Sequence, residues 1–107
     1  MITAVVRYHL PSSIDRNCCL AHYENIAPDF RDVKCLISKY FIYGDHRIAG
    51  GVYQWETRED AEAFYSGSWL TSIIERYGTN PEIEYFTMFC ITDNQANDVR
   101  VLEKNYP

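Results

Sequence analysis

Residues 50–57, Gly-Gly-Val-Tyr-Gln-Trp-Glu-Thr, constrain the fold more than any other part of this chain. Valine, tyrosine and tryptophan favour extended backbone, so the segment predicts a strand. It runs directly into the acidic stretch 58–64, where Thr57 and Asp60 resemble a capping box and predict a helix start. Any fold for this chain must therefore pass from a strand into a helix at Thr57.

A first strand and a first helix precede this junction. Residues 2–9 alternate and are rich in β-branched side chains, which predicts the strand. Helical spacing follows up to Pro28, with Ser12 or Ser13 as the expected cap and Asp15 in the first turn.

The second helix has a visible interruption. Ser-Gly-Ser at 66–68 predicts a break, and the helical pattern then continues to a stop signal at Gly78. The other elements are predicted at residues 35–43 (second strand), 44–47 (hairpin turn), 48–56 (third strand) and 83–92 (last strand).

This element order is β-α-β-β-α-β, the ferredoxin-like arrangement of an α+β domain. Its antiparallel sheet carries both helices on one face. A chain of 107 residues has the length of one domain. We expect that domain to span residues 1–93, with residues 94–107 as a C-terminal tail or arm.

Large side chains lie on both faces of the second and last predicted strands. A sheet with one face in water should instead alternate apolar with polar residues. Both faces are therefore expected to be covered, and a second copy packed sheet on sheet is the simplest cover. The sequence predicts a homodimer.

Composition excludes several classes of partner. The formal net charge of −5 disfavours binding to nucleic acid or anionic lipid, since both need clustered basic residues. The chain has no apolar run of membrane-spanning length and no signal-peptide pattern at residues 1–7, so we expect a cytoplasmic protein. It has no His pair with metal spacing and no Gly-rich phosphate loop, so we expect no metal and no nucleotide cofactor.

The strand at 50–57, the acidic helix start after it and the final strand at 84–89 carry a resemblance to a known group. Over residues 2–93 the chain resembles the dimeric α+β barrel superfamily. The most similar branch is that of the small YdhR-like monooxygenases, relatives of the antibiotic-biosynthesis monooxygenases. A fold of this kind does not fix function, because the superfamily also holds haem-degrading enzymes, isomerases and members without known activity.

The resemblance implies a cavity between sheet and helices in which an electron-rich phenol, quinol or enol reacts with O2, in many members without a cofactor. The expected function is thus a cofactor-independent monooxygenase for a small aromatic, quinol or polyketide-like compound. The alternatives are a non-catalytic barrel that binds a small ligand and a purely structural homodimer. Haem cleavage is disfavoured, because the first strand has no Asn and no His follows Trp69.

Such chemistry needs a base, an anion-stabilising donor and an apolar pocket. His9 and His22 are the candidate bases, and Arg7 is the candidate donor to a phenolate or carboxylate. Each has a plainer interpretation: Arg7 can pair with an acid at the dimer seam, His9 can make a hydrogen bond at the rim, and His22 can be solvated.

Aromatic residues of the strands and of the second helix are the candidate walls of a substrate slot. Period two places Tyr40 on one side of the second strand, Tyr53 and Trp55 on one side of the third, and Met88 on one side of the last. We group these with Arg7 and His9 of the first strand as the set that suits a ligand pocket, although the sequence does not settle whether that side faces the helices or the partner. Core packing is the alternative role for all of them. The candidate substrate-binding residues are Tyr40, Tyr53, Trp55, Trp69 and Met88.

Overall fold

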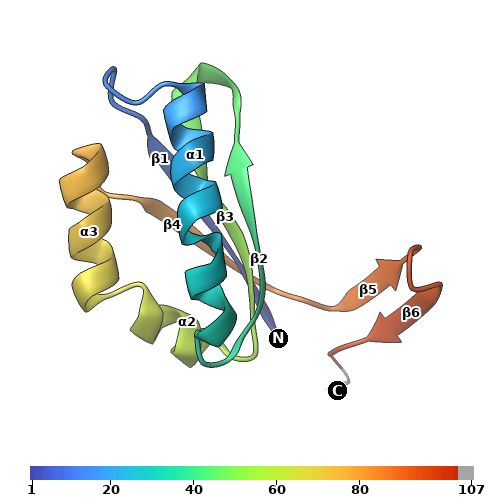
Figure 1. Ribbon diagram of the computed structural model, residues 1–107. Coiled ribbons are helices and arrows are strands. Elements are labelled where there is room, and N and C mark those ends of the chain that lie inside the picture. The colour runs from blue at the N-terminus through green and yellow to red at the C-terminus, as the bar shows by residue number, and fades with distance from the viewer. Residues whose placement is uncertain (104–107) are drawn as a thin grey trace.

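The computed structural model describes residues 1–103 and has the predicted α+β architecture (Figure 1). In chain order the elements are β1 (Ile2–His9), α1 (Arg16–Ile26), the 3-10 helix η1 (Ala27–Asp32), β2 (Leu36–Tyr43), the 3-10 turn η2 (Asp45–Arg47), β3 (Ile48–Trp55), α2 (Arg58–Phe64), α3 (Gly67–Tyr77), β4 (Glu82–Thr87), β5 (Cys90–Asp93) and β6 (Asp98–Val101).

The first four strands form one antiparallel sheet in the order β2-β3-β1-β4. The helices lie on one face of this sheet (Figure 1). Ala4, Val6 and Tyr8 of β1 are buried on that face, in one core cluster with Tyr23 of α1 and Tyr77 of α3. The predicted ferredoxin-like fold class is therefore confirmed.

The ends of the helices depend on local hydrogen bonds. Thr57 caps α2, because its Oγ1 accepts from the Asp60 backbone N–H at 3.1 Å. The predicted break is confirmed, since α2 ends at Phe64 and α3 starts at Gly67. The predicted cap of α1 is wrong: Asp15, rather than Ser12 or Ser13, accepts from the Cys18 N–H at 2.8 Å.

The prediction of one last strand over residues 83–92 is also wrong. β4 pairs with β1 only as far as Thr87, opposite Ile2, and the Met88 N–H then donates to the Met1 carbonyl at 3.1 Å. The chain leaves the sheet at this point because β1 has no further residues with which β4 could form backbone hydrogen bonds. β5 instead pairs with β6 in a hairpin that projects away from the sheet (Figure 1).

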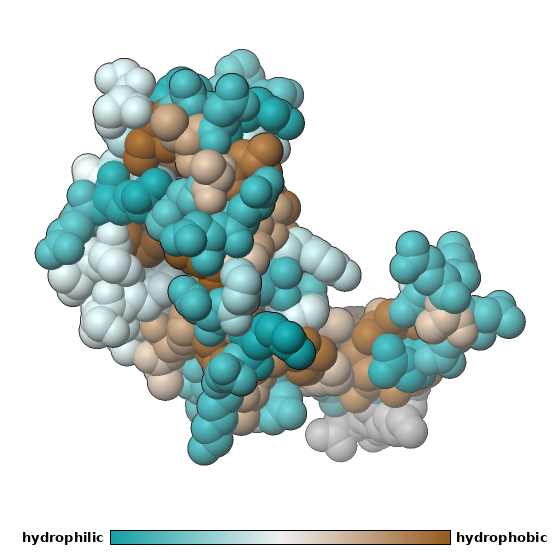
Figure 2. Space-filling view, viewed as in Figure 1, coloured by the Kyte–Doolittle hydropathy of each residue, from teal (hydrophilic) through white to brown (hydrophobic). Residues whose placement is uncertain are grey.

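The face of the sheet opposite the helices carries exposed apolar groups. Tyr40 of β2 is 64% exposed and Phe86 of β4 is 49% exposed. Val99 and Val101 of the projecting hairpin, and Phe89 directly before it, are also exposed. Figure 2 shows apolar atoms on this hairpin and where it joins the body. Within residues 1–103, no layer of the chain covers this face.

No helix within residues 1–103 is long and apolar enough to cross a membrane.

Candidate functional site

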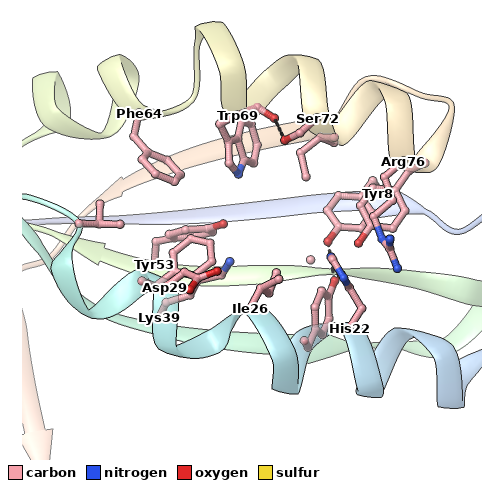
Figure 3. A pocket seen from close by; sticks show the side chains of 16 residues that line it. Tyr8, His22, Ile26, Asp29, Lys39, Tyr53, Phe64, Trp69, Ser72 and Arg76 are labelled. Atoms are coloured by element: carbon pink, nitrogen blue, oxygen red, sulfur yellow. Dashed lines mark hydrogen bonds between the residues drawn. The ribbon is translucent and has the colours of Figure 1, made fainter.

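A cavity of about 490 Å³ lies between the sheet and the helices (Figure 3). Its walls come from every layer of the fold and are mainly apolar and aromatic, which is the usual character of a small-molecule site. The lining residues are Tyr8, His22, Tyr23, Ile26, Asp29, Phe30, Val33, Lys39, Gly50, Tyr53, Phe64, Trp69, Ser72, Ile73, Arg76 and Tyr77.

Three tyrosines form one end of the cavity. The Tyr8 and Tyr23 hydroxyls lie 2.5 Å apart, and the Tyr8 ring stacks on Tyr77 with centroids 4.1 Å apart. Burial raises the pKa of Tyr8 and of Tyr23 well above the usual value. Both hydroxyls therefore stay neutral in the physiological range and can donate or accept hydrogen bonds.

His22 of α1 lies near this end with Arg76 of α3 (Figure 3). Burial lowers the pKa of His22, and the positive charges of Arg76 and Lys39 lower it further. The imidazole is therefore neutral at pH 7 and free to accept a proton. Of the two predicted bases, His22 is the one that the fold brings into the cavity.

Lys39 of β2 is the functional candidate that the sequence patterns missed. Its Nζ lies 3.6 Å from the ring centroid of Phe30, 3.9 Å from that of Phe41 and 4.5 Å from that of Tyr53. Burial lowers the pKa of Lys39 to about 7, while the ring faces favour the charged form. The sequence signal for Lys39 was the alternation of side chains along a strand. Neighbouring residues of a strand point to opposite faces, so Lys39 faces away from Tyr40.

The strand register divides the predicted site residues between two faces. Ala4 of β1 lies opposite Tyr53, whereas Arg7 lies opposite Gly50, and directly opposed residues share a face. Tyr40 lies opposite Val52, so it points away from Tyr53. The predicted grouping of Arg7, His9 and Tyr40 with Tyr53 and Trp55 is therefore wrong. The predicted alternation of side chains within each strand was correct. The pairing register between strands, which decides which residues of two strands share a face, cannot be predicted from the sequence of either strand alone.

Tyr53 and Trp69 line the cavity, as the predicted slot required, but Trp55 does not. The Trp55 side chain is fully buried behind Tyr53, with ring centroids 6.0 Å apart. Its indole N–H donates to the Tyr65 hydroxyl at 3.0 Å. Trp55 is thus placed as a core residue, which was the alternative interpretation.

The other predicted residues lie outside the cavity. Arg7 forms an ion pair with Glu84 on the open face of the sheet. His9 is exposed at the end of β1, where it lines a separate hollow of about 110 Å³ with Arg7. Met88 lies between β4 and β5, at the point where the chain leaves the sheet.

The residues that the structure describes contain no group of three His, Cys, Asp or Glu side chains placed to hold a metal ion.

Comparison with known proteins identifies the fold. No family model matches the chain, and no curated protein matches it by sequence. A protein of unknown function from Nitrosomonas europaea superposes with a TM-score of 0.67 and 11% identity, over 85% of this chain and 91% of that chain.

Two other similar structures carry a functional name. An antibiotic biosynthesis monooxygenase superposes with a TM-score of 0.62 and 8% identity, over 82% of this chain and 98% of that chain. A candidate antibiotic biosynthesis monooxygenase from Deinococcus radiodurans has a TM-score of 0.59 and 10% identity, over 82% and 92% of the two chains. The predicted resemblance in fold is confirmed, and such low identities establish the fold alone.

Proposed function

We propose that the protein is a cofactor-independent monooxygenase that oxidises a small aromatic, quinol or polyketide-like compound in the cytoplasm. The observation that supports this most is the aromatic cavity of about 490 Å³, which holds a neutral imidazole and two cationic side chains among apolar walls. The fold is shared with two structures named for antibiotic biosynthesis monooxygenases, one of them a candidate.

His22 is the proposed base. A phenol or enol placed at the tyrosine end of the cavity would transfer its hydroxyl proton to the imidazole, which leaves the substrate as an anion. Such an anion is electron-rich and can itself pass an electron to O2. The neutral state of His22 before the reaction is what this step requires.

The remaining groups of the cavity orient the ring and stabilise its charge. Tyr53 of β3 and Trp69 of α3 together form an aromatic wall of the cavity (Figure 3). The Arg76 guanidinium and the neutral Tyr8 hydroxyl lie near His22 and can donate hydrogen bonds to the developing anion.

Oxygen uptake in metal-free buffer with a panel of hydroquinones and enols tests this proposal. We expect the wild type to consume O2 and His22→Ala to be slower by about 100-fold, the lower range for loss of a general base. His46→Ala is the matched control, because His46 is exposed in η2, outside the cavity.

Other outcomes of this experiment are equally informative. A loss in His9→Ala rather than in His22→Ala would show that the wrong histidine has been chosen. Binding of the same compounds without any O2 uptake would favour the ligand-binding alternative, which needs the cavity but no base.

We propose further that a second copy covers the open face of the sheet and that the β5–β6 hairpin packs on that copy. The support is the exposed apolar surface, to which Tyr40 and Phe86 contribute on the sheet and Val99 contributes on the hairpin. Exposed apolar side chains of this kind are stabilised when a second apolar surface packs on them and removes them from water.

Light scattering at micromolar concentration should give the mass of a dimer. The double substitution Tyr40→Glu and Phe86→Glu should reduce that mass to the monomer, because it places buried charges in the interface. Ile74→Glu on α3 is the control, since Ile74 is also exposed but belongs to the helical layer. A wild-type mass equal to the monomer contradicts the homodimer.

A further inference from the structure

Two cationic side chains line the cavity without an acidic partner. The protein as a whole is acidic, with a formal net charge of −5. Lys39 and Arg76 nevertheless take part in none of the ion pairs formed within residues 1–103. A positive charge among apolar groups is costly unless an anion lies close to it, so the partly buried Lys39 favours a ligand that brings a negative charge.

Lys39 is the more enclosed of the two. Its side chain is partly buried and its ammonium group lies over the rings of Phe30, Phe41 and Tyr53, whereas the Arg76 side chain is exposed. Asp29 of η1 is the one acidic residue among those that line the cavity, and it is exposed to water and forms no ion pair with Lys39. The Lys39 charge is thus available to a bound molecule.

Lys39 and His22 lie towards different ends of the same cavity (Figure 3). The space between them is bordered by the aromatic wall that Tyr53 and Trp69 form together. A flat ring placed there would have one edge towards an amine and the other towards an imidazole.

We propose that this cavity is a site for aromatic carboxylic acids, with the carboxylate paired to Lys39 and the ring lying against the aromatic wall that Tyr53 and Trp69 form together. As a statement about turnover, the inference rests on the proposed function, because an aromatic acid bound in this way would present a ring hydroxyl to His22. As a statement about binding it is independent of that function.

The charge of Lys39 gives this binding a defined pH dependence. The titratable and charged groups that face the cavity beside it are Tyr8 of β1, His22 and Tyr23 of α1, Asp29 of η1, Tyr53 of β3, and Arg76 and Tyr77 of α3. Burial lowers the pKa of His22 and raises that of Tyr53, so both are neutral from pH 7 to pH 9. Lys39, with its pKa lowered to about 7, loses its charge in this interval.

The sign of the effect follows from proton linkage. A carboxylate beside the amine stabilises the ammonium form, so binding takes up a proton above pH 7. Affinity for the acid should therefore fall as the pH rises, by at most about tenfold per pH unit. A neutral ligand of the same shape should show no such decline.

The test compares 2-naphthoate with 2-naphthamide, which have the same ring system and differ in charge. Titration calorimetry at about pH 6.5 should show the carboxylate binding roughly tenfold or more tightly than the amide. In Lys39→Met that preference should disappear, whereas Lys34→Met should keep it, because Lys34 is an exposed lysine just before the same strand. Equal affinities in the wild type, a preference that persists in Lys39→Met, or no binding of either probe would overturn the proposal.

A second measurement needs no variant and so does not depend on the folding of Lys39→Met. Between about pH 6.5 and pH 8.5, wild-type affinity for 2-naphthoate should fall about tenfold or more while that for 2-naphthamide stays level. A flat profile for the carboxylate would overturn the assignment to Lys39.

The two proposals fail separately. Selective, pH-dependent binding of 2-naphthoate without O2 uptake on any hydroquinone or enol would leave the aromatic-acid site and remove the oxygenase. O2 uptake that depends on His22, without any preference for the carboxylate, would leave the oxygenase and remove the acid site.

Discussion

Gly50→Ala should destabilise the protein by about 3 kcal/mol or more, which for a domain of this size approaches loss of the folded state. Gly50 lies in β3 directly opposite Arg7 of β1. A Cβ atom at this position would lie 1.8 Å from the Val6 carbonyl oxygen and 2.8 Å from the Val6 carbonyl carbon. Both are backbone atoms of a central strand, so no side-chain movement can relieve the overlap.

Denaturant unfolding of Gly50→Ala and Gly44→Ala measures this effect with a matched control. Gly44 precedes the η2 turn, and a Cβ there would meet nothing closer than the Ile48 carbonyl oxygen at 3.6 Å, an ordinary contact. We expect Gly44→Ala to stay within about 0.5 kcal/mol of the wild type. A Gly50→Ala protein of similar stability would mean that β1 and β3 do not approach as closely as described.

The close approach at Gly50 also shows where the sequence was informative about the fold. The Gly-Gly strand and the helix start that follows it located β3 and α2, because their signals are local: side-chain propensity, alternation and a capping residue. The course of residues 83–92 depended instead on where β1 begins, which is a contact between segments far apart in the sequence. Local patterns contain no such information, so one strand was predicted where two exist.

The candidate site shows the same division. His22, Tyr53 and Trp69 were predicted from residue type, because a histidine can act as a base and aromatic side chains can line a substrate slot. The fold brings all three to the same cavity. Arg7 and Tyr40 were placed with them through an assumed register, and the observed pairing puts both on the other face. Lys39 was missed because a lysine in a strand is usually solvated, and only the tertiary structure places Phe30 of η1 over its amine.

Trp55→Ala should destabilise the protein by about 3–5 kcal/mol, the range for removing a large buried aromatic side chain. The Trp55 side chain is fully buried and packs against the rings of Tyr53, Phe64 and Tyr65. Its removal leaves a space that these neighbours cannot fill without leaving their own positions. It also takes away the donor to the Tyr65 hydroxyl.

Trp69→Ala is the matched comparison, because Trp69 is the second tryptophan of the chain and lines the cavity as a partly buried residue. Chemical denaturation, followed by circular dichroism because each variant loses a fluorophore, should show a smaller loss for Trp69→Ala than for Trp55→Ala. Binding of 2-naphthamide by the folded proteins should follow the opposite order, with Trp69→Ala the weaker binder. If Trp69→Ala proved the more destabilising, Trp69 would belong to the core, and the aromatic wall that both proposals assign to it would be lost.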